Sequence, residues 1–462
     1  MIITAPRQVM FTYLTNTKII LLVFTCLLLS KTTNANIYCN TELTDTTPIL
    51  DPAFEQALID LNIDNNGIAG SINNADARFI ETLSIADLSI SNLSGIEAFE
   101  NLRNLFARDN NIVSANFSQN INLEILDLEN NKLSSLNVLN NSALLELSIS
   151  NNQLMSINIS NNIQLEYLSC NLNSLDALDI SANLNLTDLR CYSNNLSSIN
   201  LNANLALEML FISQNNLNTL DVSLNTGLDT LTFDNNNISS IDLSNNTALE
   251  YLGCSNNILN VLDLSANTNL TRLLCNNNNL TALNLSTAPD LFLLYTMNNQ
   301  LESLDISGNA ALRFFRAENN SLISLDIRNG ANDLINEFVI TQNPNLLCVF
   351  VDDSNASYLE DWELDDTSTF VEDNSECETL SVNEYFSTDF MLYPNPANEE
   401  VHIGLNTPNT NIKLYTMKGQ LLFEKELAQG SNAINISNFN PGLYVVAIES
   451  ENSVTTRKLV IN

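Results

Sequence analysis

The side chains that most often carry catalysis or hold metals are either scarce in this sequence or far apart. The 462 residues include a single histidine, His402. A lone histidine excludes His-cluster metal sites, and it removes Ser-His-Asp and Cys-His catalysis over most of the chain. Carboxylates are plentiful, with 53 Asp and Glu side chains. Because two carboxylates suffice to hydrolyse a glycosidic bond, a hydrolase of surface polymers stays open as an alternative.

Four of the eight cysteines are spaced by 21, 63 and 21 residues and occupy a position at which leucine recurs. A metal or redox site would need them to converge, but two pairs so far apart along a repeating chain cannot reach one ion. We therefore expect buried free thiols in two neighbouring pairs. The four residues are Cys170, Cys191, Cys254 and Cys275.

The charge is strongly acidic and unevenly placed. The formal net charge is −36, and residues 36–378 hold nine basic against 45 acidic side chains. The negative charge repels phosphate backbones, which excludes nucleic acid as a partner. Charged partners should instead be cations or basic surfaces. Yet 45% of the chain is hydrophobic, so it is no disordered acidic tail.

Residues 102–332 repeat every 21 residues in eleven uninterrupted copies. One copy, residues 123–143, reads LEILDLENNKLSSLNVLNNSA and contains the pattern L-x-x-L-x-L-x-x-N twice. Such self-similarity predicts a solenoid. Because both half-repeats carry L-x-L before an asparagine, we expect parallel sheets on two opposite flanks. The pattern resembles leucine-rich repeats, specifically a bacterial 21-residue class.

The asparagine that closes the first half-repeat occurs in all eleven copies, from Asn110 to Asn320. Its amide both donates and accepts hydrogen bonds, so we expect it to satisfy backbone groups of the turn from inside. The second half-repeat has the same asparagine except at Ala288 and Gly330.

Solenoid ends need caps. We expect residues 36–101 to form an N-terminal cap with irregular first coils, in which Asp51 caps a helix that starts at Pro52. The solenoid should run over 102–344, with its last coil displaced by a two-residue insertion, and residues 345–378 should form the C-terminal cap.

One outward column of the second half-repeat is always Asn or Asp, usually followed two residues later by a small residue. Stacked carboxylates could gather calcium, although a hydrogen-bond ladder with the neighbouring serines is favoured, so no cofactor is required. The weak calcium candidates are Asp242, Asp263, Asp305 and Asp326.

The outward positions of the first half-repeat vary between copies and are rich in aromatic residues and arginine. Exposed large side chains on a rigid sheet are typical of recognition surfaces. We therefore predict a ligand-binding face here. The alternative is a solvent-exposed face that accepts many residue types without a function. Its members are Phe106, Tyr167, Arg190, Tyr192, Phe211, Tyr251, Arg272, Tyr295, Phe314 and Arg316.

The N-terminus has the features of an export signal. Lys18 precedes the short apolar run 19–29, and small residues lead to a plausible cleavage point after Ala35. Residues 1–35 are thus a predicted signal peptide, and no later stretch is long and apolar enough to cross a membrane. In an exported protein, Cys348 and Cys377 in one cap predict a disulfide.

Residues 379–462 consist of short alternating runs separated by turns, which predicts a small antiparallel β-sandwich. Its motifs, in order, resemble the type A C-terminal sorting domain (Por) of the type IX secretion system. The resemblance implies that the machinery of this system carries the protein through the periplasm and the outer membrane, to be secreted or displayed on the cell surface. The motif residues are Tyr393, Pro394, Asn395, Pro396, Gly419, Gly442, Tyr444 and Lys458.

Together these features predict a repeat solenoid with a leucine-rich-repeat array, capped at both ends and followed by a β-sandwich. The expected function is adhesion-like binding of a protein or glycan at the cell surface, without enzymatic activity. The alternatives are a surface polymer hydrolase and a purely structural surface-layer component.

Overall fold

The computed structural model describes residues 45–381, 390–405, 410–450 and 453–462. The predicted signal peptide and its cleavage point therefore lie outside the described residues. The solenoid has one continuous hydrophobic core that extends from Ile49 to Trp362, and the C-terminal sheets enclose a core of their own.

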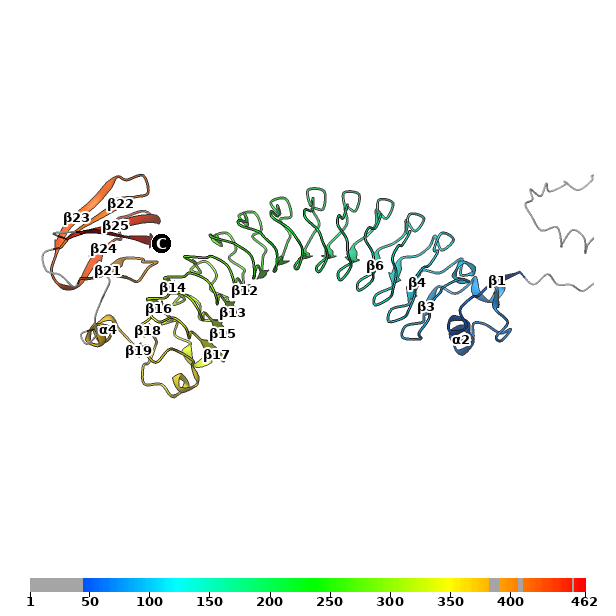
Figure 1. The fold of residues 1–462 in the computed structure, drawn as a ribbon, viewed down its shortest axis with the longest axis horizontal. Coiled ribbons are helices and arrows are strands. Elements are labelled where there is room, and N and C mark those ends of the chain that lie inside the picture. Colours follow the sequence, from blue (N-terminus) through cyan, green and yellow to red (C-terminus); the bar gives the residue numbers. More distant parts are fainter. Residues whose placement is uncertain (1–44, 382–389, 406–409, 451–452) are drawn as a thin grey trace, which may run out of the picture. The chain divides into compact units, whose positions relative to one another are not determined.

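Each coil of the solenoid contributes a three-residue strand to one parallel sheet of 13 strands, which lines the inner, concave side of the curved solenoid (Figure 1). The central leucine of each strand points into the core, and Leu231 is paired with Leu210 and with Leu252. The predicted solenoid is confirmed. The strands are β3 (Thr82–Ser84), β4 (Asn104–Phe106), β5 (Ile125–Asp127), β6 (Glu146–Ser148), β7 (Tyr167–Ser169), β8 (Asp188–Arg190), β9 (Met209–Phe211), β10 (Thr230–Thr232), β11 (Tyr251–Gly253), β12 (Arg272–Leu274), β13 (Leu293–Tyr295), β15 (Phe314–Arg316) and β17 (Glu337–Val339).

The second parallel sheet, which the sequence predicted along the whole opposite flank, is confined to the C-terminal end. In the earlier coils the second half-repeat forms no strand, although its L-x-L pattern is the same. The expectation of two full-length sheets is therefore wrong in its extent. The four strands of the second sheet are β14 (Ser303–Asp305), β16 (Ser324–Asp326), β18 (Cys348–Phe350) and β19 (Thr369–Val371).

Curvature explains why identical patterns differ on the two flanks. Backbones pair into a sheet only when they lie about 4.8 Å apart. In a curved stack the inner edge is the shorter one, so this spacing is kept on the concave side and exceeded opposite. There a side chain bridges the coils instead: Asn204 Nδ2 donates to the carbonyl oxygens of Ile180 at 3.0 Å and Asn183 at 2.8 Å.

The asparagine that closes the first half-repeat bonds in the expected manner. Asn131 Nδ2 donates to the carbonyls of Ala107 and Leu128, both at 3.0 Å, and its Oδ1 accepts from the N–H of Ile112 at 2.9 Å. Since the same bonds recur in successive coils, the side chain both closes its own turn and ties it to the preceding coil. The predicted role of this column is confirmed.

The residue before this asparagine has a left-handed backbone in all eleven copies, with φ between 50° and 59°. Asparagine tolerates this conformation better than other residues with a Cβ, which explains the recurrent Asn-Asn doublets. The column is Asp109, Asn130, Asn151, Leu172, Ser193, Gln214, Asn235, Asn256, Asn277, Asn298 and Asn319.

The N-terminal cap is built around α2 (Pro52–Asp60), whose buried Phe54 and Leu58 join the core of the solenoid. Asp51 Oδ1 accepts from the N–H of Ala53 at 2.8 Å, so the predicted helix cap is confirmed. The other oxygen, Oδ2, accepts from the N–H and the hydroxyl of Ser91 at 2.6 and 2.7 Å. One carboxylate thus fastens the cap helix to the first coil.

The rest of this cap is short. The remaining elements before the regular coils are β1 (Thr46–Pro48), β2 (Ser71–Asn73), α3 (Asn74–Ala77) and the 3₁₀ helix η1 (Ile96–Ala98).

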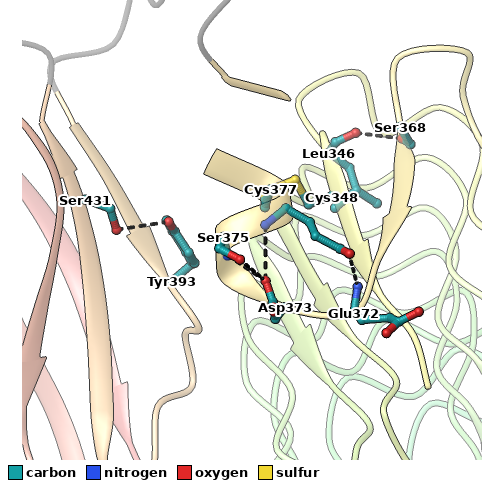
Figure 2. The surroundings of a disulfide bond; sticks show 10 residues. Leu346, Cys348, Ser368, Glu372, Asp373, Ser375, Cys377, Tyr393 and Ser431 are labelled. Carbon is teal, nitrogen blue, oxygen red and sulfur yellow. Dashed lines mark hydrogen bonds between the residues drawn. A yellow bond between two sulfur atoms is a disulfide. The ribbon is translucent and has the colours of Figure 1, made fainter. Parts of the chain in front are cut away.

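Aromatic rings and a disulfide close the other end. Trp362 stacks on Phe338 with ring centroids 4.0 Å apart, and Phe338 packs on Phe315. Cys348 and Cys377 are joined by a disulfide, with 5.8 Å between their Cα atoms (Figure 2). The predicted pairing is present in the structure. This region also contains η2 (Asn332–Leu334), η3 (Ser357–Asp361) and α4 (Asn374–Ser381).

The C-terminal part forms two antiparallel sheets around a separate core, as the sandwich prediction requires. One sheet has the strand order β20-β21-β24 and the other β23-β22-β25-β26. Their bounds are β20 (Phe390–Tyr393), β21 (Glu400–Leu405), β22 (Thr410–Thr416), β23 (Leu421–Leu427), β24 (Gly430–Asn435), β25 (Gly442–Ser450) and β26 (Ser453–Ile461).

Candidate binding surface

Nine of the ten residues of the predicted ligand-binding face belong to strands of the 13-stranded sheet, and the tenth, Tyr192, lies two residues after the end of β8. In each strand the central residue is buried, so the first and third residues project outward, away from the core. The ten side chains therefore occupy three adjacent columns rather than one strip. The first residue of a strand is Tyr167, Tyr251, Arg272 or Phe314, the last is Phe106, Arg190, Phe211, Tyr295 or Arg316, and Tyr192 lies two residues after Arg190.

Arg190 is held in place from three sides. Its Nε and Nη2 donate to the carboxylate of Asp188, with the shortest distance 2.9 Å. Its guanidinium carbon lies 5.4 Å from the ring centroid of Tyr167 and 5.2 Å from that of Phe211. The hydrogen bonds to Asp188 raise the pKa of Arg190. We call these four residues the Arg190 cluster; it presents a fixed, half-buried cation between two rings.

A second group forms at the C-terminal end of the same sheet. Tyr295 donates its hydroxyl to Glu337 Oε2 at 2.8 Å, and Arg316 pairs with Glu318 and Glu337. Phe314 packs edge-on against Phe292, with ring centroids 5.4 Å apart. These contacts fix the orientation of three of the ten predicted residues.

The remaining predicted residues are not gathered in these groups. Phe106 lies on β4, three strands before the Arg190 cluster, and Arg272 is exposed. Tyr192 and Tyr251 are half-buried rather than fully exposed. The sheet therefore has a patterned surface, in which two ordered groups are separated by the strands β10 to β12.

Sequence reasoning missed Asp234, which lies between the two groups. Its Oδ2 accepts from the hydroxyl of Ser213 at 3.1 Å, and its Oδ1 accepts from the N–H of Ser255 at 2.7 Å. Burial raises the pKa of this carboxyl. Burial, and then the nearby charge of Asp234, raise the pKa of Tyr251. The one signal in the sequence was Gly253, the only glycine in the strands of the 13-stranded sheet.

The Asp/Asn column on the opposite flank makes local hydrogen bonds. Asp242 Oδ1 accepts from the N–H of Ser244 at 3.0 Å, and Asn200 makes the same bond to Asn202. An acceptor two residues before an N–H is all that the position needs, which explains why Asp and Asn alternate. The expected ladder consists of bonds within each coil.

The four calcium candidates stand in this column. Each of Asp242, Asp263, Asp305 and Asp326 accepts from an N–H two residues later, and Asp326 also pairs with Arg328. Among the described residues, no three His, Cys, Asp or Glu side chains are grouped so that they could hold a metal ion.

The four repeat cysteines are fully buried free thiols, as predicted. Burial raises the pKa of Cys170 to about 12 and has the same effect on Cys275. A thiol that stays protonated and enclosed is neither a nucleophile nor a metal ligand.

Several residues of the C-terminal motif have defined structural roles in the sandwich. Asn395 Nδ2 donates to the carbonyl of Lys458 at 2.8 Å, and its Oδ1 accepts from the N–H of Val460 at 2.7 Å. Tyr444 donates its hydroxyl to the carbonyl of Asn440 at 2.6 Å. Gly419 has a φ of 80° in the turn between β22 and β23. Asn395 therefore joins the start of this domain to its last strand, β26.

Comparison with known proteins agrees with the structure of the solenoid and with that of the C-terminal sandwich. Residues 391–462 match the family model described as secretion system C-terminal sorting domain. The functional domain of InlJ from Listeria monocytogenes, described as including a cysteine ladder, has 24% identity and a TM-score of 0.60, over 90% of this chain and 99% of that domain. The solenoid is a leucine-rich-repeat array.

Two further solved structures share the fold of this leucine-rich-repeat array. An internalin, InlF, from Listeria monocytogenes has 20% identity and a TM-score of 0.59, over 71% of this chain and 99% of that chain. A leucine-rich-repeat protein of Leptospira interrogans has 24% identity and a TM-score of 0.54, over 62% of this chain and 84% of that chain. No curated protein sequence matches the chain.

The sorting domain implies export by the type IX secretion machinery, to the cell surface or into the medium. Within the described residues, no helix combines the length and apolar character that a membrane span requires. The leucine-rich-repeat array is thus part of an exported protein.

Proposed function

We propose that the protein binds a protein or glycan ligand at the outer cell surface, in an adhesion-like role, through the concave sheet. The observation that carries this proposal is the Arg190 cluster. An arginine fixed by Asp188 between two rings loses little side-chain entropy on binding, which is how preorganised anchors gain affinity. Arginine and aromatic residues are also the side chains most enriched among residues that dominate binding energy.

The contrast between the flanks supports the same surface. The Asp/Asn column serves its own turns, whereas the outward columns of the sheet vary from coil to coil. A hydrolase would need a pocket with two facing carboxylates, and no insertion interrupts the eleven copies to build one. A structural surface-layer component would be favoured by uniform surfaces on both flanks. We therefore propose binding without catalysis.

The test begins with glycan and protein arrays probed with the full chain. A ligand found there is titrated against Tyr192→Ala, Phe211→Ala, Tyr251→Ala and Tyr295→Ala. Truncating a buried anchor is expected to cost about 2 kcal/mol of binding at one or more of these positions. Folding should change little, because none of the four belongs to the core.

Asp242→Asn and Asp263→Asn, on the opposite flank, are the matched controls and should leave binding intact. If the aspartate variants abolish binding while the aromatic set is silent, the concave sheet is the wrong face, and calcium-mediated contact becomes the better hypothesis. Hydrolysis of an array glycan by the full chain would support the enzyme alternative instead.

A further inference from the structure

A carboxylate without a cation lies at the centre of the concave sheet. Asp234 lies two residues after the end of β10, and Ser213 Oγ and the N–H of Ser255 donate hydrogen bonds to its oxygens at 3.1 and 2.7 Å. The hydroxyl of Ser255 and the N–H of Asp234 itself also act on this carboxylate. All of these donors are uncharged, so the negative charge of the partly exposed carboxylate is hydrogen-bonded but is not neutralised.

Gly253 provides the space that this carboxylate occupies. A Cβ at residue 253 would come within 2.9 Å of Asp234 Oδ2 and within 3.2 Å of Thr232 Cγ2. In the other ten copies this outward position holds a side chain, such as Phe211 two strands earlier and Tyr295 two strands later. The carboxylate can therefore lie against β11 only because residue 253 is glycine.

Two of the arginines on this sheet are already paired with carboxylates of their own, and the third, Arg272 beside Tyr251, is exposed and forms no ion pair with Asp234. Arg190 is bound to Asp188, and Arg316 to Glu318 and Glu337. Within the described part of the chain, no Lys, Arg or His nitrogen lies at ion-pair distance from Asp234. Burial disfavours its charged form and raises its pKa. Because folding has already desolvated this carboxylate in part, an arriving cation gains attraction at a smaller further cost.

Tyr251 completes the environment. Its half-buried ring belongs to β11, and the charge of Asp234 contributes to its raised pKa after burial. A carboxylate beside an aromatic ring suits an ammonium or guanidinium head whose apolar stem packs on the ring. The acidic solenoid also attracts basic surfaces over longer distances.

We propose that the ligand is a protein that places a lysine or arginine side chain on Asp234, beside Tyr251. This inference rests on the proposed function and deepens it, because it names the chemistry of the partner. An amino sugar would carry the same charge without the long apolar stem, and it is treated as a competing outcome of the test.

The experiment selects short random peptides, displayed on phage, for binding to the full chain. Binders are then synthesised in pairs, in which each lysine is replaced by norleucine and each arginine by citrulline, and chitosan oligomers form the amino-sugar arm. The selected peptides should contain a basic residue whose replacement lowers affinity about tenfold or more, as for a close charge pair.

The matched variants of the chain are Asp234→Asn and Asp242→Asn. Asparagine at 234 can still accept from Ser255 and bond to Ser213, so the fold should be kept while the charge is lost. Asp234→Asn should weaken the peptides about tenfold, whereas Asp242→Asn, which removes the same charge from the other flank, should change affinity by less than about twofold. Thermal unfolding of both variants checks that folding is intact.

A second pair of variants moves the carboxylate without removing it. Gly253→Ala should displace Asp234 and weaken the peptides, because the new methyl group meets the free end of that side chain. Gly308→Ala is the control, since a Cβ there has no heavy atom within 4 Å.

The inference is overturned if no peptide is selected, if the binders lack a basic residue, or if Asp234→Asn binds them as tightly as the parent chain. It is also overturned if only chitosan depends on Asp234. Peptides that depend on Phe211 and Arg190 but not on Asp234 would refute this inference and leave the proposed function standing. Ligands that depend on no residue of the concave sheet would refute the proposed function itself.

Discussion

The side chain of Asn215 is bonded to the backbone of Leu196 in the preceding coil: Oδ1 accepts from the leucine N–H at 3.0 Å. On the other side its Nδ2 donates to the carbonyls of Cys191 and Ile212, both at 3.1 Å. The amide is buried, so these groups have no access to water in its place. With the carbonyl of Ser213, to which Nδ2 also donates at 3.2 Å, one side chain satisfies four backbone groups in two coils.

Asn215→Ala should lower the free energy of unfolding by about 3 kcal/mol, because several buried backbone groups lose their partner. Asn216→Ala is the control: its side chain is exposed, and the change should be close to neutral. Urea unfolding followed by circular dichroism measures both. Equal midpoints for the two variants would contradict the role assigned to this column.

Leu172 is the one aliphatic residue in the left-handed column, with φ 54° and 46% of its surface exposed. Leu172→Asn should raise the free energy of unfolding by about 1 kcal/mol, because asparagine tolerates this backbone conformation better. The reverse change, Asn256→Leu at the same φ, should lower stability by a similar amount. Thermal unfolding of the pair tests the argument, and shifts of the same sign would refute it.

Much of this architecture follows from the sequence because each signal is repeated eleven times. The leucines of residues 123–143 fix which side chains are buried, and the asparagine column fixes the turn. The extent of the second sheet does not follow. The strands at Ser303–Asp305 and Ser324–Asp326 share their pattern with earlier coils that form none, because coil spacing on the outer flank depends on curvature.

The candidate site was predictable only as a list of outward residues. Which of them meet depends on single side chains rather than on the repeat: Asp188 positions Arg190, and Glu337 positions Tyr295. Asp234 was missed because an acid in an acidic chain carries no signal until Gly253 is seen to make room for it. Periodicity identifies a surface, but it cannot identify contacts that occur once.

The buried cysteines should make the solenoid sensitive to alkali. Burial raises the pKa of Cys170 and of Cys275 from 9.0 to about 12, so these thiols keep their protons in the folded chain at a pH where the unfolded chain loses them. Their contribution to stability is therefore present below about pH 9 and is lost as pH rises toward 12. The melting temperature should decrease more between pH 7 and pH 10 for the parent chain than for a Cys170→Ala/Cys275→Ala variant. Equal decreases in the two proteins would contradict this prediction.

Opening the disulfide should weaken the C-terminal cap. Cys348 and Cys377 close a segment with a sequence separation of 29, and freeing such a loop costs about 3.6 kcal/mol in the chain-entropy model. Cys348→Ser should lower the unfolding midpoint accordingly, whereas Cys191→Ala should act only through a small core cavity. Mass mapping without reduction should find the two half-cystines joined, and free thiols at both positions would refute the bond.

Export predicts two processed ends. Protein recovered from the surface of the producing cells, or from their medium, should begin near Asn36 and lack most of residues 379–462, because the sorting domain is expected to be removed on passage. Terminal peptide mapping tests both ends. An intact C-terminus on surface material would count against the sorting assignment.

The absence of strand pairing on most of the outer flank determines how the solenoid responds to force. Thirteen hydrogen-bonded strands make the concave sheet nearly inextensible, while the coils before Ser303 are joined opposite by side-chain amides such as Asn204. When the solenoid is bent, the spacing between coils changes mainly on the outer flank, and the length of the concave sheet stays nearly constant. A partner bound across several strands would then stay bound under shear, because the distances between the strands that it contacts hardly change.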